Sequence, residues 1–196
     1  RIDVAAVENA LRTESIAAIA VSRPTNPTGN VLTNGEVRRL SALADAAGIP
    51  LILDNAYGAP FPGVIFTEAE PFWSPQTILT LSLSKLGLPG TRTGIVIAPP
   101  QIIEALAAMT AIAGLANGTI GQQLVLPFVE SGEILNFGPQ ILRPFYEAKS
   151  HQAQNWTEAA FNSRGVNWAL HVSEGAFFHW LWLPGMPIPT LELYER

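Results

Sequence analysis

Residues 77–92 read TILTLSLSKLGLPGTR, an apolar run that passes into hydroxyl and basic side chains. The part from Thr77 to Leu83 has the length and the composition of a buried strand rather than of a helix. Ser84 and Lys85 follow it directly. In α/β sheets ligands bind outside the carboxyl ends of the strands, so this stretch predicts a strand that delivers a lysine to a ligand site.

Three other short apolar runs, at residues 16–21, 50–53 and 93–98, also predict strands. Helical patterns separate them, at residues 3–13 and 33–48. In the second pattern Thr33 and Glu36 have the spacing of a capping box, and Gly48 ends the helix. Its apolar stripe comprises Val37, Leu40, Leu43 and Ala44. Alternating strands and helices predict an α/β sheet flanked by helices.

The last third of the chain differs from the first. Helical patterns fill residues 100–165, and a long one at 145–162 could bridge two domains. Residues 167–172 and 176–183 then predict a strand pair around Ser173-Glu174-Gly175. Residues 191–196 read as the start of a helix, and the chain lacks an initiator Met, so we expect a longer protein that continues at both ends.

Composition narrows the class of protein. Hydrophobic residues make up 48% and charged residues 14%, which indicates a buried core, and no apolar run approaches the roughly 18 residues of a membrane span. The net charge of −5, without long charged runs, predicts neither a nucleic-acid nor a membrane partner. The absence of cysteine excludes disulfides and fits a cytoplasmic protein. His151, His171 and His179 lack metal-ligand spacing.

Polar residues follow several of the predicted strands. Asn26 stands in RPTNPTG (23–29), Asp54 and Tyr57 stand in DNAYG (54–58), and Lys85 and Arg92 follow the run quoted above. Singly, each has an ordinary explanation: a turn, a cap, a loop aromatic, a solvated lysine, a surface ion pair. Because each falls just past a buried strand, their side chains are expected to converge on one cleft.

These stretches resemble the fold-type I aminotransferases in their residues, their order and their separations. The likeness covers RPTNPTG (23–29), DNAY (54–57) and SLSKLGLPGTR (82–92), and it extends to EGAFF (174–178). The resemblance implies a three-layer sandwich with a mostly parallel sheet over residues 1–145. Residues 146–196 would form the interdomain helix and the start of a small α+β domain.

The resemblance also implies a cofactor, pyridoxal 5'-phosphate, with Lys85, Asp54 and Tyr57 as catalytic residues. Lys85 would form a Schiff base with the cofactor and then, once freed, move a proton between the substrate's alpha carbon and the cofactor. Asp54 would hold the ring nitrogen protonated, which lets the ring accept charge.

The same resemblance implies further cofactor-binding residues. The Asn26 amide and the Tyr57 hydroxyl would donate to the ring hydroxyl, with a cis bond between Asn26 and Pro27. Arg92 and Ser82 would bind the phosphate, and Ser84 is a further candidate.

One departure from the wider family is the spacing of seven between Lys85 and Arg92, where many members keep eight. The shorter loop, with DNAYGAPFPG (54–63) and EGAFFHWLW (174–182), is similar to bacterial members that transfer the amino group of valine to pyruvate, giving 2-oxoisovalerate and alanine. The expected partners are therefore an amino acid and a 2-oxo acid.

Two alternatives stay open from sequence. A ligand-sensing domain of a transcription regulator can share the seven-residue spacing, and a pyridoxal-phosphate lyase or decarboxylase would keep every cofactor contact. The family implies a homodimer for the full-length protein. Its phosphate loop, ring-stacking aromatic and carboxylate-binding arginine fall outside these 196 residues, so we expect the isolated chain to be inactive. Arg23, Arg143 and Arg164 are not assigned to the substrate carboxylate on residue type alone.

Overall fold

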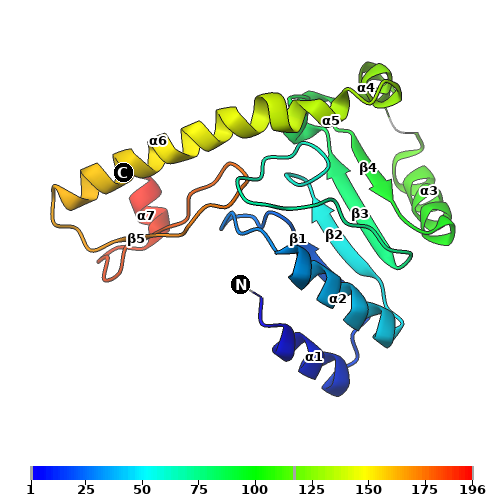
Figure 1. Cartoon of the computed structure of the whole chain (residues 1–196), viewed down its shortest axis with the longest axis horizontal. Coiled ribbons are helices and arrows are strands. Elements are labelled where there is room, and N and C mark those ends of the chain that lie inside the picture. Colours follow the sequence, from blue (N-terminus) through cyan, green and yellow to red (C-terminus); the bar gives the residue numbers. More distant parts are fainter. Residues whose placement is uncertain (1, 117, 196) are drawn as a thin grey trace.

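The computed structural model, which describes residues 2–116 and 118–195, has a four-stranded sheet as its centre (Figure 1). The strands lie side by side in chain order: β1 (Ile19–Ser22), β2 (Leu51–Asn55), β3 (Thr77–Ser82) and β4 (Gly94–Ile97). The first three are parallel, and β4 is antiparallel to β3. This confirms the predicted α/β class with a mostly parallel sheet.

Helix α2 (Asn34–Ala47) covers one face of the sheet. Alternate residues of β2 and β3 point into this core, and α2 meets them with its apolar stripe. The buried members are Leu51, Leu53, Leu79 and Leu81 of the sheet and Val37, Leu40 and Ala44 of the helix. Helix α1 (Val4–Thr13) packs against α2, and Val125 of α4 (Ile120–Glu130) joins the same core. The opposite face of the sheet is less covered.

The predicted limits of α2 are confirmed by its two ends. Thr33 Oγ1 accepts a hydrogen bond from the Glu36 amide at 3.1 Å, and the Glu36 carboxylate accepts one from the Thr33 amide at 2.7 Å. Together these bonds form the capping box. Gly48 ends the helix at φ +67°, a conformation that costs glycine little.

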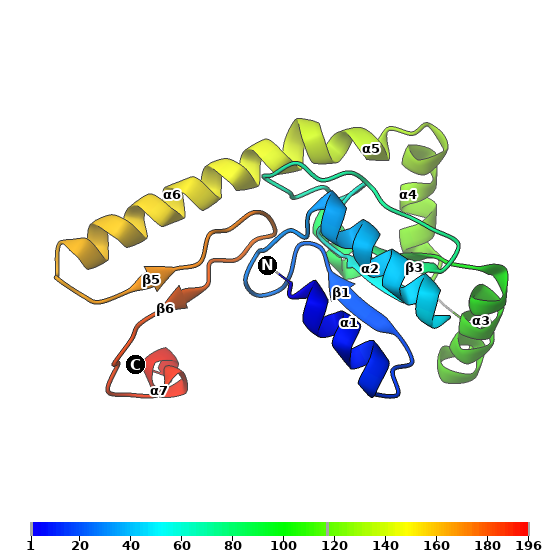
Figure 2. The same cartoon turned by 60° about the horizontal axis from the view of Figure 1, so that its bottom comes forward.

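Helical segments dominate after β4, as predicted. They are α3 (Pro100–Gly114), α4, α5 (Ile134–Phe137), a π-helical turn (Gly138–Leu142) and α6 (Arg143–Asn162). Helix α6 extends beyond the sheet in both views, and β5 (Ala169–Leu170) and β6 (Leu181–Trp182) follow it (Figures 1 and 2). Helix α7 (Thr190–Glu195) confirms the predicted terminal helix, although Arg196 lies outside the described residues. Over residues 2–116 and 118–195, no helix has the length and apolar character to cross a membrane.

Two sequence predictions were wrong in detail. The strand predicted at residues 50–53 ends too early, because Asp54 and Asn55 still pair with β3 and extend β2. The predicted strand pair is reduced to two residues on each side. Residues 173–176 lie in the connection between these two strands, as predicted. Their main-chain groups bond to two loops of the sheet, since the Glu174 amide donates to Gly29 at 3.0 Å and the Phe66 amide donates to Glu174 at 2.8 Å.

The capping box gives a test of the fold. Replacing Thr33 with alanine removes the acceptor for the Glu36 amide and should lower the free energy of unfolding by about 0.5–2 kcal/mol. Replacing Thr33 with serine keeps that acceptor and should restore most of the loss. Urea titration of the full-length protein measures both variants, and equal stabilities for the alanine and serine variants would contradict the capping role.

Candidate active site

The carboxyl ends of β1, β2 and β3 lie at one edge of the sheet, because the three strands are parallel and in register. The seven residues predicted for the site lie at or just past this edge. Asn26 lies in the turn after β1, Asp54 in β2, Tyr57 in the loop after β2, and Ser82 at the end of β3. Ser84 and Lys85 belong to a single 3₁₀ turn (Ser84–Leu86), and Arg92 follows a second one (Pro89–Thr91).

Tyr57 and Lys85 approach one another across this edge. Lys85 is half-buried, and its Nζ lies 5.3 Å from the centroid of the buried Tyr57 ring. Phe177 and Phe178 make edge contacts with that ring at centroid distances of 5.2 and 5.4 Å. The aromatic contacts fix the ring, and the ring in turn limits where the lysine amine can lie.

Arg92 and two serines form a second group. Arg92 is exposed and adopts φ +48°, which is uncommon for a residue other than glycine. Its Nη1 lies 3.4 Å from Ser84 Oγ, and the Ser84 amide donates to Ser82 Oγ at 3.2 Å. A guanidinium beside two hydroxyls and a main-chain amide is a donor set suited to a phosphate.

The Asp54 carboxylate accepts hydrogen bonds from both neighbouring strands. Its Oδ1 accepts from the Ala56 amide at 3.0 Å and from Thr80 Oγ1 at 3.3 Å, and its Oδ2 accepts from Ser22 Oγ at 3.5 Å. Among the described residues no lysine or arginine forms an ion pair with it. Since each carboxylate oxygen can accept two hydrogen bonds, Oδ2 keeps room for one more donor.

The loop after β1 is held by a buried arginine. Arg23 is 2% exposed and donates to Leu32 O at 2.6 Å, to Asn34 Oδ1 at 2.7 Å and to Glu70 O at 2.9 Å. Burial lowers the pKa of the Arg23 guanidinium, and the nearby carboxylates of Glu36 and Glu70 oppose that shift. Arg23 thus holds the loop, which supports leaving it unassigned to a substrate carboxylate.

Asn26, on the same loop, is exposed at the sheet edge, and its bond to Pro27 is cis, as predicted. The loop also contains Gly29, at φ +72°, where an added Cβ would lie 2.9 Å from Gly175 O. The close approach of residue 175 therefore requires glycine at position 29.

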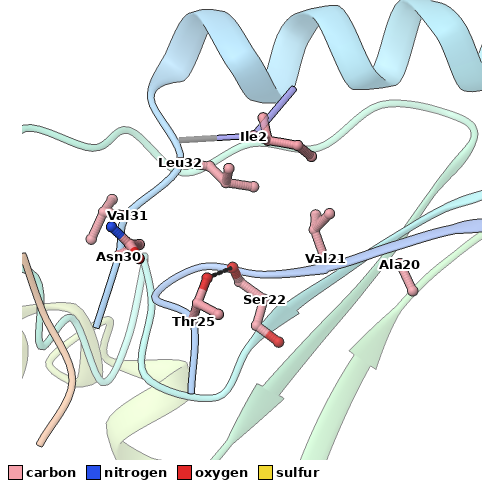
Figure 3. Close-up of a pocket in the computed structure, with 8 residues that line it drawn as sticks. All are labelled: Ile2, Ala20, Val21, Ser22, Thr25, Asn30, Val31 and Leu32. Atoms are coloured by element: carbon pink, nitrogen blue, oxygen red, sulfur yellow. Dashed lines mark hydrogen bonds between the residues drawn. The ribbon is translucent and has the colours of Figure 1, made fainter. Parts of the chain in front are cut away.

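Sequence reasoning missed Ser22 and Thr80. Neither belongs to a recognisable motif. Each is recognised as a neighbour of Asp54 only because the strand register pairs it with that residue. Ser22 also lines a hollow of about 350 Å³ beside β1, together with Thr25 and apolar side chains including Ile2 and Leu32 (Figure 3). Thr25 Oγ1 donates there to Ser22 O at 3.2 Å. None of the predicted cofactor residues lines this hollow, so it adjoins the candidate site without forming it.

The groups at the sheet edge fit pyridoxal phosphate chemically. They comprise a half-buried amine, a carboxylate with spare acceptor capacity, and a cation beside hydroxyls. These suit an aldehyde, a protonated ring nitrogen and a phosphate respectively.

Comparison with known proteins identifies the family. Residues 1–185 match the family model described as Aminotransferase class I and II. The chain belongs to this family. It is 45% identical over 183 residues to valine–pyruvate aminotransferase of Escherichia coli (strain K12), covering 93% of this chain and 43% of that protein.

Two solved structures of aminotransferases also match. One, assigned as an amino-acid aminotransferase of Psychrobacter arcticum 273-4, has a TM-score of 0.93 and 45% identity, over 100% of this chain and 45% of that one. The valine-pyruvate aminotransferase of Salmonella typhimurium LT2 has a TM-score of 0.80 and 43% identity, over 94% and 48%. The chain thus spans less than half the length of these relatives.

The glycine after Tyr57 gives a test of the site's architecture. A Cβ at Gly58 would collide with Arg23 O and lie 2.9 Å from Asn55 Oδ1. Replacing Gly58 with alanine should therefore push the loop after β2 away from the loop after β1, and lower the free energy of unfolding by about 1–3 kcal/mol.

The matched control is alanine at Gly35, in the first turn of α2, where a Cβ would meet only Thr33 Oγ1 at 4.0 Å. That variant should keep or slightly raise stability, because alanine favours helix over glycine. Denaturant titration of both full-length variants makes the comparison, and a Gly58 variant as stable as the control would disprove the close approach.

Proposed function

We propose that the full-length protein is a pyridoxal-phosphate-dependent aminotransferase, with Lys85 as the residue that binds the cofactor. The observation that carries the proposal is the placement of Lys85 at the end of β3, half-buried against Tyr57, at the sheet edge that also bears Asp54 and Arg92. A lysine amine is the nucleophile that forms a Schiff base with an aldehyde.

Each polar group then has a role. When bound, pyridoxal phosphate supplies an electron sink for the charge left at the substrate's alpha carbon. Lys85 would hold the cofactor through its aldehyde group, with loss of water, and its Nζ would carry a proton to and from the substrate's alpha carbon. Asp54 would hold the ring nitrogen through a hydrogen bond from the ring N–H. The remaining residues bind and orient: Asn26 and Tyr57 at the ring hydroxyl, and Ser82, Ser84 and Arg92 at the phosphate.

We infer valine and pyruvate as the substrate pair, with 2-oxoisovalerate and alanine as products. Support comes from the identity of 45% and 43% to two proteins named for that reaction. The seven-residue spacing between Lys85 and Arg92 also favours this subset. We further propose a homodimer in the cytoplasm, in which residues 1–145 belong to the cofactor-binding domain and residues 146–196 begin the small one.

An assay of the full-length protein separates this reaction from a lyase. Alanine formation from pyruvate and valine would support transamination, whereas release of ammonia or carbon dioxide would indicate a lyase or decarboxylase. Cofactor binding with no turnover of any tested amino acid would favour the ligand-sensing alternative.

Lys85 can be tested directly, with Lys149, the other lysine of residues 1–196, as its control. Borohydride reduction of the full-length protein loaded with pyridoxal phosphate should fix the cofactor to Lys85, as mapped by peptide mass spectrometry. Replacing Lys85 with alanine should abolish the label. Replacing Lys149, whose Nζ lies 5.8 Å from the Phe145 ring on α6, should leave it unchanged. An undiminished label in the Lys85 variant would refute the assignment.

Asp54 is tested by its replacement with asparagine, which keeps the shape of the side chain but removes its charge. Leaving the ring N–H without a carboxylate should cost about 3–5 kcal/mol, or roughly 10²- to 10⁴-fold in kcat. Steady-state kinetics with valine and pyruvate measures the loss. Turnover equal to that of the unmodified enzyme would show that Asp54 does not act on the ring.

A further inference from the structure

Ser22, Asp54 and Thr80 form one row across three parallel strands. Ser22 is the register partner of Asp54, and Asp54 is the register partner of Thr80. Register partners in a parallel sheet point to the same face and stand about 4.8 Å apart. The three polar side chains therefore lie together on the face opposite to α2, and the carboxylate is in the middle.

The preceding row on the same face is entirely apolar. It consists of Ala20, Ile52 and Ile78, which are partners in the same register. The change from apolar to polar thus occurs on all three strands at once, at the last shared row before the sheet edge. Each flanking strand thus adds a hydroxyl beside a carboxylate that already accepts a hydrogen bond from the Ala56 amide of its own loop.

The hydrogen bonds show what this row does to the carboxylate. Thr80 Oγ1 lies 3.3 Å from Oδ1, and Ser22 Oγ lies 3.5 Å from Oδ2, so a donor flanks each oxygen. Both distances are at the long end of the range for a hydroxyl and a carboxylate. Donors on opposite sides resist rotation of the carboxylate about its Cβ–Cγ bond.

The charge of Asp54 remains uncompensated by these contacts. Within the described part of the chain no cation pairs with it, and neutral hydroxyls orient a carboxylate without neutralising it. A positive charge beside a carboxylate is favourable in a half-buried site. A protonated pyridine ring would supply one to Oδ2, which can accept a further hydrogen bond.

We propose that Ser22 and Thr80 are positioning residues that hold the Asp54 carboxylate in the orientation in which Oδ2 receives the ring N–H of the cofactor. This inference rests on the proposed function. The two hydroxyls act through Asp54 and touch neither substrate nor cofactor. They favour the protonated ring indirectly, by keeping the acceptor aimed at it.

The test uses the full-length holoenzyme and variants that preserve shape: Thr80→Val, Ser22→Ala, and both together. Ring-nitrogen protonation is read from the ¹⁵N chemical shift of cofactor labelled at that nitrogen, and cofactor affinity from its dissociation constant. We expect each single change to weaken cofactor binding by about 3- to 10-fold, and the double variant to move the ¹⁵N signal toward that of a neutral ring.

Two controls separate positioning from folding. Thr80→Ser keeps the hydroxyl and should restore both readouts. Ile78→Val trims the same strand in the apolar row, two residues earlier, and should change neither. A double variant with an unaltered ¹⁵N signal and unaltered affinity would overturn the inference, and so would failure of Thr80→Ser to restore them.

The outcome also distinguishes this inference from the proposed function. If the unmodified full-length protein binds no pyridoxal phosphate, the proposed function fails and the inference fails with it. If it binds the cofactor with a protonated ring and the double variant does the same, only the positioning role of Ser22 and Thr80 is wrong.

Discussion

The parallel register of β1, β2 and β3 is the constraint on which the rest of the structure depends. It pairs Ser22 with Asp54 and Asp54 with Thr80, so three strands from distant parts of the chain end at the same level. Each loop that leaves this edge carries part of the candidate site. Because the strands are joined by long connections rather than hairpins, the loops can differ in sequence while their starting points remain fixed.

The core enforces this register. Leu53 of β2 and Leu79 of β3 are partners and are both buried beneath α2, whereas Asp54 and Thr80 point the other way. Side chains alternate along a strand, so a slip of one residue would drive Asp54 into the core and expose Leu53. Burying an unpaired carboxylate would cost several kcal/mol, which adds to the apolar area lost. The same leucines that stabilise the fold therefore also aim the carboxylate.

Much of the fold could be predicted because its signals are local. The capping box at Thr33 and Glu36, the apolar stripe of α2 and the glycine at its end all lie within 16 residues, and each acts through a near neighbour in the chain. The order of polar motifs after apolar runs also predicted that Lys85 and Tyr57 lie at one edge of the sheet, and the structure places them there. These patterns depend on helix and strand periodicity alone.

What could not be predicted depends on pairing between distant segments. Asp54 has the appearance of a loop residue, since aspartate is disfavoured in strands, and only its partners on both sides extend β2 to include it. Ser22 and Thr80 likewise carry no signal in the sequence, because only strand pairing brings them to Asp54. Residues 173–176 were predicted only as the connection of a strand pair, yet their main-chain groups bond to loops more than 100 positions earlier.

Residues 173–178 contact a part of the molecule other than the one that their position in the chain suggests. Residues 173–178 follow α6 in the chain, but Glu174 bonds to Gly29, Val31 and Phe66, and Phe177 packs against Tyr57. The ring beside Lys85 is therefore held from both sides of the proposed domain boundary. The surroundings of the lysine amine therefore depend on residues that follow α6 as well as on the loop after β2, and the candidate site cannot be assigned to the sheet and its loops alone.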